Sequence, residues 1–476
     1  MTTMAARDAT MFWLSRRTAN DVFLLYSFGE TDTATAELRA FVAARAARIP
    51  DLRIRLQEIP GDLGYPYWVS AEFTSQQFIH HRPDGLAWRE LLTDLGELLG
   101  TGIVATEFPW RIHVFRGVRS APRSAEPVMV VVLQLSHALA DGTRAAAIAR
   151  ALFGPAVDED VVHSTPGAPV DNSAHRPVGP AQTSTQPVDS CGQPCGWISR
   201  RVDPRWLGVL RFPQQLAATV WRGRAAYQAQ RELADRTAAG EVPAAATGFA
   251  PCALNPEFEV GERGVRMMVA DATDLRIPGR TVTVVAMTAI SRALAEYLRE
   301  RGEPPKRLGT ALPMALPAPS SARNNYRGLS IDLHIDEPDL RIRADLIADE
   351  LATRRERALN PLLRAQDRVG EVVPSLLAKR DVERADLGHV PAALDGNTVV
   401  SSVYRGPADL AFAGAPVLFT GGFPALGTVM HLTHGVHGIG ENVTLSVHSD
   451  LRVLPDPNRY LELLAESLAA VVAAHR

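Results

Sequence analysis

Residues 128–144 read Val-Met-Val-Val-Val-Leu-Gln-Leu-Ser-His-Ala-Leu-Ala-Asp-Gly-Thr-Arg, and this stretch says most about the fold. The apolar run from Val128 to Leu135 predicts a buried strand, and the Ala-rich run from Gly142 to Phe153 predicts a helix. Between them lies a polar turn with the pattern His-x-x-x-Asp-Gly, residues 137–142. A turn between a strand and a helix often holds a catalytic side chain rigidly.

The three polar positions of this turn suit distinct roles. The His137 imidazole can act as a general base, because its unperturbed pKa lies close to neutral pH. Asp141 directly precedes the predicted helix, where its carboxylate can accept hydrogen bonds from free N–H groups. Gly142 permits a tight turn. Because histidines at strand ends are common, a purely structural histidine is the alternative at this point.

Other stretches, in the same order along the chain, extend the pattern. Together with the His137 motif they resemble the wax ester synthase/diacylglycerol acyltransferase family, within the superfamily of CoA-dependent acyltransferases and condensation domains. The His137 motif resembles that family's HHxxxDG. The other stretches are Asp8-Ala-Thr-Met-Phe-Trp-Leu14, Pro50 to Leu56 with Leu63 to Val69, Phe108 to Gly117, Ser401-Ser-Val-Tyr-Arg-Gly-Pro407 and Thr433 to Thr444.

The resemblance implies an α/β fold of two chloramphenicol acetyltransferase-like domains, with the active site in a tunnel at their interface. It implies that His137 takes a proton from an alcohol, such as diacylglycerol or a long-chain alcohol, which attacks an acyl-CoA thioester. Asp141 would organise the site by pairing with an arginine. Acyl-CoA is then a substrate, and no other cofactor is expected. The products would be triacylglycerol or wax esters.

The chain departs from the family pattern at several positions. Ser136 stands at the first histidine of HHxxxDG, Ser402 replaces an asparagine, and Gly279 to Val285 lacks an Asn-Asp pair. Two other functions therefore stay open: a carrier-protein-dependent or specialised-metabolism acyltransferase of the same fold, and a noncatalytic acyl-lipid-binding protein. The resemblance implies substrate-binding roles for Ser136, Ser401, Ser402, His434 and Asn442.

A chain of 476 residues is too long for one core. We expect an N-terminal domain over 1–153, a flexible linker rich in Pro, Ser, Gly and Thr over 154–196, and a second domain over 197–476. Periodicity predicts helices over 35–48, 88–99, 205–235 with a break at Pro213, 282–299, 340–359 and 457–475, and strands over 308–316, 398–403 and 442–448.

The composition excludes several classes of protein. A net charge of −3 argues against a general nucleic-acid binder. The odd number of cysteines, three, indicates a reducing cytosol, and neither Cys191-x-x-x-Cys195 nor His431, His434 and His437 forms a convincing metal site. We see no transmembrane run or signal peptide, and we expect a cytoplasmic protein.

Two further segments carry weaker signals. Phe78-Ile-His-His-Arg-Pro-Asp-Gly85 superficially resembles HHxxxDG, but its spacing and proline predict a turn. Residues 197–231 carry seven arginines and four Trp or Phe residues, with one acidic residue. Basic residues among aromatics suit an anionic membrane or lipid-droplet surface. The alternative is a helix between the domains that packs its aromatic side chains and solvates its arginines.

Overall fold

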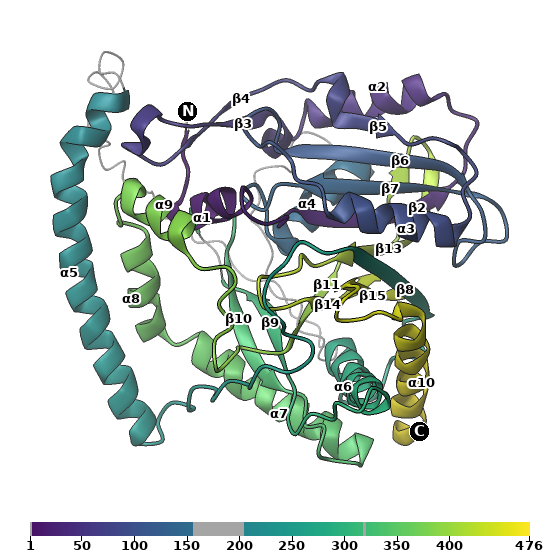
Figure 1. Cartoon of the computed structure of the whole chain (residues 1–476). Helices are drawn as coiled ribbons and strands as arrows, with labels where there is room; N and C mark the ends of the chain where they lie inside the picture. Colours follow the sequence, from purple (N-terminus) through teal and green to yellow (C-terminus); the bar gives the residue numbers. More distant parts are fainter. Residues whose placement is uncertain (1, 156–203, 318–319) are drawn as a thin grey trace, which may run out of the picture.

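The computed structural model describes residues 2–155, 204–317 and 320–476 (Figure 1). Two six-stranded mixed sheets, each covered by helices, confirm the predicted α/β class. Residues 154–196, predicted as a linker, lie almost wholly outside the described residues.

The first sheet is built around the strand that the sequence singled out. Its strand order is β12-β13-β2-β7-β6-β5, with only β5 and β6 parallel. β7 is buried along its whole length because it is central, which explains its unbroken apolar run. The bounds are β2 Val22–Gly29, β5 Phe78–His80, β6 Trp110–Val118, β7 Val128–Leu135, β12 Ala411–Phe412 and β13 Ala415–Phe423.

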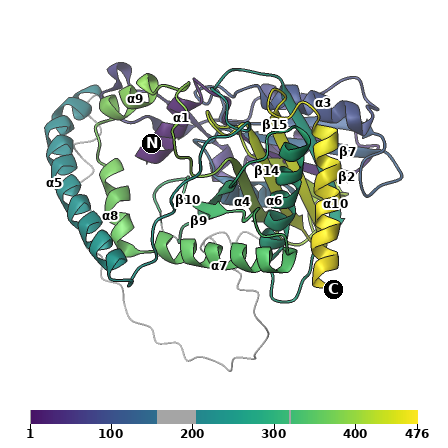
Figure 2. The ribbon, with the colours of Figure 1, turned by 60° about the horizontal axis from the view of Figure 1, so that its bottom comes forward.

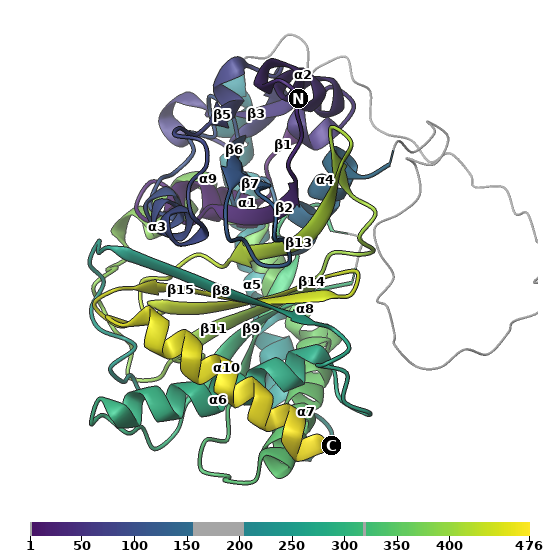
Figure 3. The ribbon, with the colours of Figure 1, turned by 90° about the vertical axis from the view of Figure 1, so that its right-hand side faces the viewer.

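The second sheet has the order β10-β9-β11-β14-β15-β8, in which β9, β11 and β14 are parallel neighbours. Helices α6, α7 and α10 cover one of its faces (Figure 3). The strands are β8 Arg263–Asp271, β9 Gly309–Ala315, β10 Tyr326–Asp332, β11 Thr398–Tyr404, β14 Leu432–Ile439 and β15 Asn442–Asp450. The helices are α6 Val282–Glu300, α7 Leu340–Ala358 and α10 Pro457–His475.

The remaining elements surround the first sheet. A small antiparallel sheet joins β1 Thr2–Thr3, β4 Tyr67–Ser70 and β3 Ile54–Gln57. Helices α1 Ala6–Leu14, α2 Thr35–Ala46 and α4 Gly142–Phe153 share one core with the sheet, and α3 Trp88–Leu99 packs on its other face. Short 3-10 turns cover Pro50–Leu52, Pro60–Asp62 and Ser75–Gln77.

Helix α5 Pro204–Ala238 lies alongside α8 Pro361–Gly370 at the edge of the molecule, with α9 Ser375–Arg384 near α1 (Figure 2).

The two sheets interlock. Strand β13, from the segment predicted as the second domain, pairs with β2 of the first sheet and packs over β14 and β15. A shared hydrophobic core joins residues of β2, β7 and β13 to Val265 and Met267 of β8. The two halves therefore meet across a packed interface.

Most predicted elements are confirmed, and β7, α3, α4 and α10 have the predicted bounds. The predicted break at Pro213 is wrong, because α5 continues through it. A proline removes one N–H donor, and a long helix can retain the rest of its hydrogen bonds.

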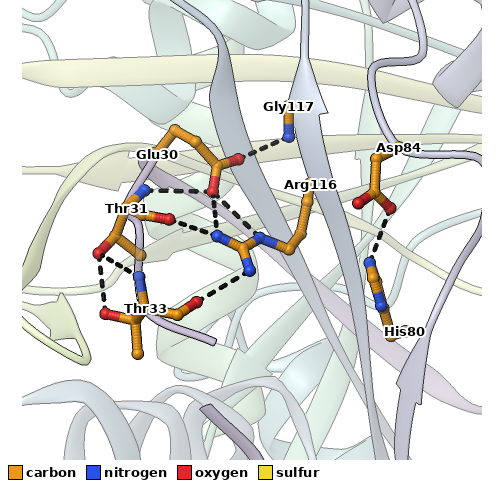
Figure 4. Close-up of polar contacts among 7 residues, drawn as sticks. All are labelled: Glu30, Thr31, Thr33, His80, Asp84, Arg116 and Gly117. Carbon is orange, nitrogen blue, oxygen red and sulfur yellow. Dashed lines mark hydrogen bonds and ion pairs between the residues drawn. The ribbon is translucent and has the colours of Figure 1, made fainter. Parts of the chain in front are cut away.

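The turn predicted in the segment at 78–85 is confirmed after residue 80, whereas Phe78–His80 form strand β5. His80 Nε2, at the end of that strand, pairs with Asp84 of the turn at 2.8 Å (Figure 4). Beside it Glu30 accepts hydrogen bonds from Arg116 and from the Gly117 amide, which ties β2 to β6 (Figure 4). Both contacts are structural.

Candidate active site

His137 lies two residues beyond the end of β7, in a short loop that leads to α4. The loop is fixed by its backbone: the Ser136 amide donates to Pro109 O and the Leu139 amide donates to Ser136 O, both at 2.8 Å. Its neighbours Ser136 and Ala138 are buried, whereas His137 itself is only partly buried. The fold therefore presents one imidazole at the end of a rigid central strand.

Asn324, in the loop between β9 and β10, determines the tautomer of this imidazole. Asn324 Oδ1 lies 2.8 Å from His137 Nδ1, and its Nδ2 donates to the His137 carbonyl oxygen at 2.7 Å. An amide oxygen can only accept a hydrogen bond, so the ring proton must reside on Nδ1. The lone pair then lies on Nε2, for which no described residue provides a hydrogen-bond partner.

Asp8 of α1 fixes the orientation of Asn324. Its Oδ1 accepts from Asn324 Nδ2 at 3.0 Å and from the Asn324 backbone amide at 2.9 Å, and its Oδ2 accepts from the Arg323 amide at 2.9 Å. Asp8 is only 1% exposed, and burial raises its pKa although these donors oppose the shift. Because Asp8 occupies the amide nitrogen of Asn324, the amide oxygen must face His137.

Burial lowers the pKa of His137, while the Asn324 hydrogen bond and the charges of Asp141 and Asp8 oppose the shift. The imidazole is therefore neutral at neutral pH. A neutral ring with its proton held on Nδ1 presents a free Nε2, which is the state that a general base requires.

Asp141 is the N-cap of α4, as the sequence predicted. Its Oδ1 accepts from the Arg144 amide and its Oδ2 accepts from the Asn325 amide, each at 2.9 Å. The arginine pairing implied by the resemblance is not found, because both oxygens accept from backbone donors and no described arginine side chain pairs with Asp141. Asp141 thus fixes the start of α4 against the β9–β10 loop.

The nearby arginines pair with Asp51 instead. Arg144 donates to both Asp51 oxygens at 2.9 Å, and Arg323 Nη1 donates to Oδ1 at 2.7 Å. Burial opposes ionisation of Asp51, but the hydrogen bonds and charges of the two arginines outweigh it and lower its pKa. Asp51 therefore joins α4 of the first half to the β9–β10 loop of the second.

The other predicted site residues lie in different surroundings. Ser136 is buried next to His137, and its hydroxyl has no partner among the described residues. Ser401 lies on the same face of β11 as Val403, which faces Gly142: a Cβ on this glycine would lie 3.7 Å from Val403 Cγ2. Ser402 points to the opposite face, where its hydroxyl lies 2.8 Å from Thr283 Oγ1 of α6.

The structure does not bring His434 or Asn442 to His137. His434 is 1% exposed, and its two ring nitrogens bond to Thr398 Oγ1 at 3.1 Å and Tyr460 Oη at 2.7 Å. It faces the helices that cover the second sheet, which leaves no nitrogen for a substrate. Asn442 Nδ2 donates to Leu418 O at 2.9 Å, a bond between β15 and β13.

Sequence reasoning missed Arg323 and Asn324, and it gave Asp8 no role. In the sequence these two residues belong to an Arg-Asn-Asn run before a short alternating segment, Tyr326 to Asp332. Such a run ordinarily indicates a loop, and nothing in its spacing points to a residue 187 positions away.

A cavity of about 840 Å³ opens beside this site. Asn324 and Asn325 line it, whereas His137 does not. Four arginines contribute to its wall: Arg7, Arg327, Arg364 and Arg368. Arg327 pairs with Asp367, but Arg364 and Arg368 form no ion pair with a described residue.

The described residues offer neither a metal-binding cluster nor a membrane-spanning helix. No group of three or more His, Cys, Asp or Glu side chains among them is arranged to hold a metal ion. Within the same residues, no helix combines the length and apolar character needed to cross a bilayer.

The site is thus a neutral histidine just beyond a central strand, placed where two mixed sheets of an α/β fold meet. Residues 4–275, more than half of the chain, match the family model described as wax ester synthase/diacylglycerol acyltransferase catalytic domain. The chain belongs to the wax ester synthase/diacylglycerol acyltransferase family, and it is an acyltransferase. A comparison with curated protein sequences gives no match.

Solved structures agree on the fold. The wax ester synthase/diacylglycerol acyltransferase from Marinobacter aquaeolei VT8 superposes with a TM-score of 0.61 at 19% identity, covering 100% of both chains. A starter condensation domain of rhizomide synthetase, solved with C8-CoA and Leu-SNAC, gives 0.55 at 12% identity, covering 100% of this chain and 94% of that one. The first condensation domain of the CDA synthetase gives 0.54 at 13%, covering 98% and 96%. The expected architecture of two chloramphenicol acetyltransferase-like domains is thereby confirmed.

Proposed function

We propose that this enzyme transfers a fatty acyl group from a CoA thioester to an alcohol, with His137 as the general base. The observation that carries this proposal is the hydrogen bond that His137 Nδ1 donates to Asn324 Oδ1, which leaves Nε2 able to accept a proton. His137 Nε2 takes the hydroxyl proton as the alcohol oxygen attacks the thioester carbonyl. The C–S bond then breaks, and the imidazolium returns the proton to the thiolate.

Both proposed substrates have support. The cavity beside Asn324 carries arginines with no ion-pair partner among the described residues, which suits the phosphates of a CoA donor. The solved condensation domain of rhizomide synthetase binds C8-CoA. For the acceptor, the family description favours diacylglycerol or a long-chain alcohol, which would give triacylglycerol or wax esters. No cofactor beyond acyl-CoA is needed.

The test is thiol release from a panel of acyl-CoA thioesters with alcohol acceptors. General-base catalysis contributes roughly 10²- to 10⁴-fold in rate, so His137→Ala should lose activity by that order. The exposed His389 provides a matched control, and His389→Ala should retain full activity. Thiol release that persists in His137→Ala would contradict the role of His137 as the general base. No release from any CoA thioester, with an intact fold, would favour a carrier-protein donor or a noncatalytic acyl-lipid binder.

We further propose that α5 attaches this cytoplasmic enzyme to the inner membrane face or to lipid droplets, where apolar acceptors reside. Its exposed side carries Leu216, Val220, Trp221 and Tyr227, with Trp221 75% exposed. Arg224 and Arg231 are exposed on the same side, and residues 214–231 contain no acidic side chain. Apolar and cationic side chains together suit an anionic lipid interface.

Flotation with phosphatidylglycerol-containing liposomes tests this attachment. Replacing Trp221 with Ser, or Arg224 and Arg231 with Glu, should move the enzyme out of the floated fraction. Arg299→Glu, an equally exposed site on α6, should not. Unchanged flotation of the α5 variants would show that this helix does not bind lipid.

A further inference from the structure

Tyr326 is an aromatic residue that lies beside the imidazole of His137. It begins β10, two positions after Asn324, and it is partly buried. The centres of the tyrosine and imidazole rings lie 6.2 Å apart, and the ring planes are inclined by 45°. The segment that fixes the proton on His137 Nδ1 therefore also places a phenol next to the same ring.

The alternation of side chains along β10 turns Tyr326 toward the first half of the molecule. Leu329 and Ile331 belong to the core that the second sheet shares with its helices. Successive side chains of a strand point to opposite faces, so Tyr326 points away from these helices. Its ring accordingly reaches the loop after β7, where His137 lies.

Arg7 of α1 fixes the position of this tyrosine. Its Nη2 donates to the Tyr326 carbonyl oxygen, and its guanidinium carbon lies 4.9 Å from the centre of the tyrosine ring. A cation over an aromatic face is attracted by the electrons of the ring. Two contacts from one side chain therefore hold the ring in place.

The Tyr326 hydroxyl is a hydrogen-bond donor at neutral pH. Burial and the Asp141 charge raise the pKa of Tyr326, although the Arg7 charge opposes the shift, so the hydroxyl keeps its proton. This hydroxyl forms no hydrogen bond with any residue that the structure describes. A phenol O–H can donate to a negative charge that develops during a reaction. Tyr326 thus offers an uncommitted donor beside the proposed base.

Other donors around His137 are already engaged. The amide nitrogen of Asn324 donates to Asp8 and to the His137 carbonyl oxygen, and the two nearby arginines pair with Asp51. The Ser136 hydroxyl is a second donor without a partner among the described residues, but Ser136 is only 1% exposed. The partly exposed tyrosine is therefore the more accessible of the two.

We propose that the Tyr326 hydroxyl donates a hydrogen bond to the oxyanion that forms when the alcohol oxygen attacks the thioester carbonyl. This inference rests on the proposed acyl transfer. His137 takes the alcohol proton and returns it to the thiolate as the C–S bond breaks, while Tyr326 keeps its own proton throughout. The hydrogen bond is strongest at the tetrahedral intermediate, because the carbonyl oxygen carries a full negative charge only there.

Tyr326→Phe tests this role, because phenylalanine keeps the ring and its contact with Arg7 and removes only the hydroxyl. Loss of one oxyanion donor lowers kcat by roughly 10²- to 10³-fold, and thiol release should fall by that order. The KM values for both substrates and the Tm should stay close to those of the wild type, because only an interaction of the transition state is lost. The acidic limb of the pH profile should keep its position, since His137 loses no hydrogen bond.

Tyr67→Phe is the matched control. Tyr67 of β4 is also partly buried, and its hydroxyl forms no hydrogen bond within the described part of the chain. This variant should retain full kcat. Ser136→Ala measures the competing donor, and it should lower kcat less than Tyr326→Phe does.

Full kcat in Tyr326→Phe, together with an inactive His137→Ala, would overturn the role of Tyr326 and leave the proposed function intact. A higher KM with unchanged kcat would also overturn it, because the hydroxyl would then bind the substrate and the transition state equally. A larger loss of kcat in Ser136→Ala than in Tyr326→Phe would assign the oxyanion to Ser136 instead. A wild type that releases no thiol from any thioester would contradict the proposed function, and the role of Tyr326 with it.

Discussion

At the scale of single residues, the proposed general base depends on one amide. Asn324 sets the proton on His137 Nδ1, and Asp8 sets the orientation of Asn324. The acceptor at Nδ1 is a neutral amide, so the imidazolium formed during turnover receives less stabilisation than a carboxylate would provide. The acid–base properties of this site therefore respond directly to the residue at position 324.

The pH profile of kcat/KM checks this arrangement. Since the pKa of His137 is lowered, activity should fall at a pH below 6.5, where the ring becomes protonated. Asn324→Asp places a negative charge at Nδ1, which should move this acidic limb to higher pH. Asn324→Leu should lose roughly 10- to 100-fold in kcat, because the tautomer is no longer fixed.

Asn325→Leu is the matched control, since among the described residues the Asn325 side chain bonds only to Leu316 O. It should leave the position of the acidic limb unchanged. An identical limb in Asn324→Asp and the wild type would contradict the role of Asn324.

At the scale of elements, the β7–α4 turn combines two functions. It presents His137, and through Asp141 it caps α4 and holds the β9–β10 loop that carries Asn324. We therefore expect Asp141 to affect activity by positioning the loop, with no part in proton transfer.

Asp141→Ala should reduce the free energy of unfolding by about 1–2 kcal/mol, because the Arg144 and Asn325 amides lose their acceptor. It should also lower kcat, since the loop that carries Asn324 loses a contact.

Thr281→Ala is the control. It removes the N-cap side chain of α6, because Thr281 Oγ1 accepts from the Val284 amide at 3.3 Å. It should destabilise the fold by about 1 kcal/mol with kcat unchanged. Equal effects on kcat would show that stability alone is responsible.

Another buried carboxyl, that of Asp21, lies directly before β2. Asp21 Oδ2 accepts from the Ile103 amide and from Gln134 Nε2 at 2.9 Å, while Oδ1 has no partner among the described residues. Burial raises the pKa of Asp21 to about 7. Because the folded state retains this proton and the unfolded state does not, the contribution of Asp21 to stability falls as pH rises from about 4 through 7.

Asp21→Asn removes this titration. The free energy of unfolding of the variant relative to the wild type should therefore increase by about 3 kcal/mol between pH 5 and pH 8. Urea unfolding at the two pH values measures it. A constant difference would show that Asp21 is ionised in the folded protein.

At the scale of the whole molecule, the site exists only where the two halves meet. Asp51 connects Arg144 of α4 with Arg323 of the β9–β10 loop, beside Asn324. The packed interface thus aligns the proposed base, which follows a strand of one sheet, with Asn324 from a loop of the other.

Asp51→Asn should lower stability by about 1–3 kcal/mol and should reduce kcat, because two partly buried guanidinium groups lose their counter-charge. Glu441→Gln breaks the exposed ion pair with Arg276 and should cost less than about 1 kcal/mol, with activity retained. Equal losses in the two variants, measured by urea unfolding, would contradict the role of Asp51 at the interface.

The local elements and the candidate base could be predicted from the sequence alone. The runs at 128–135 and 142–153 predicted β7 and α4 at their observed bounds, and the turn between them indicated His137 and the Asp141 cap. These features depend on periodicity and on neighbours a few residues away, which a sequence displays directly.

Only the tertiary structure decided what surrounds the base. His137 contacts Asn324, which lies 187 residues away along the chain. Asn324 in turn contacts Asp8, near the N-terminus. Strand pairing and loop packing bring these residues together, and no local pattern predicts that. Strand β13 joins the first sheet through pairing with the distant strand β2. His434 faces the helices because alternate residues of β14 point to opposite faces of the sheet. Local structure follows from neighbouring residues in the sequence. The partner of a side chain and the face to which it points depend on packing between distant segments.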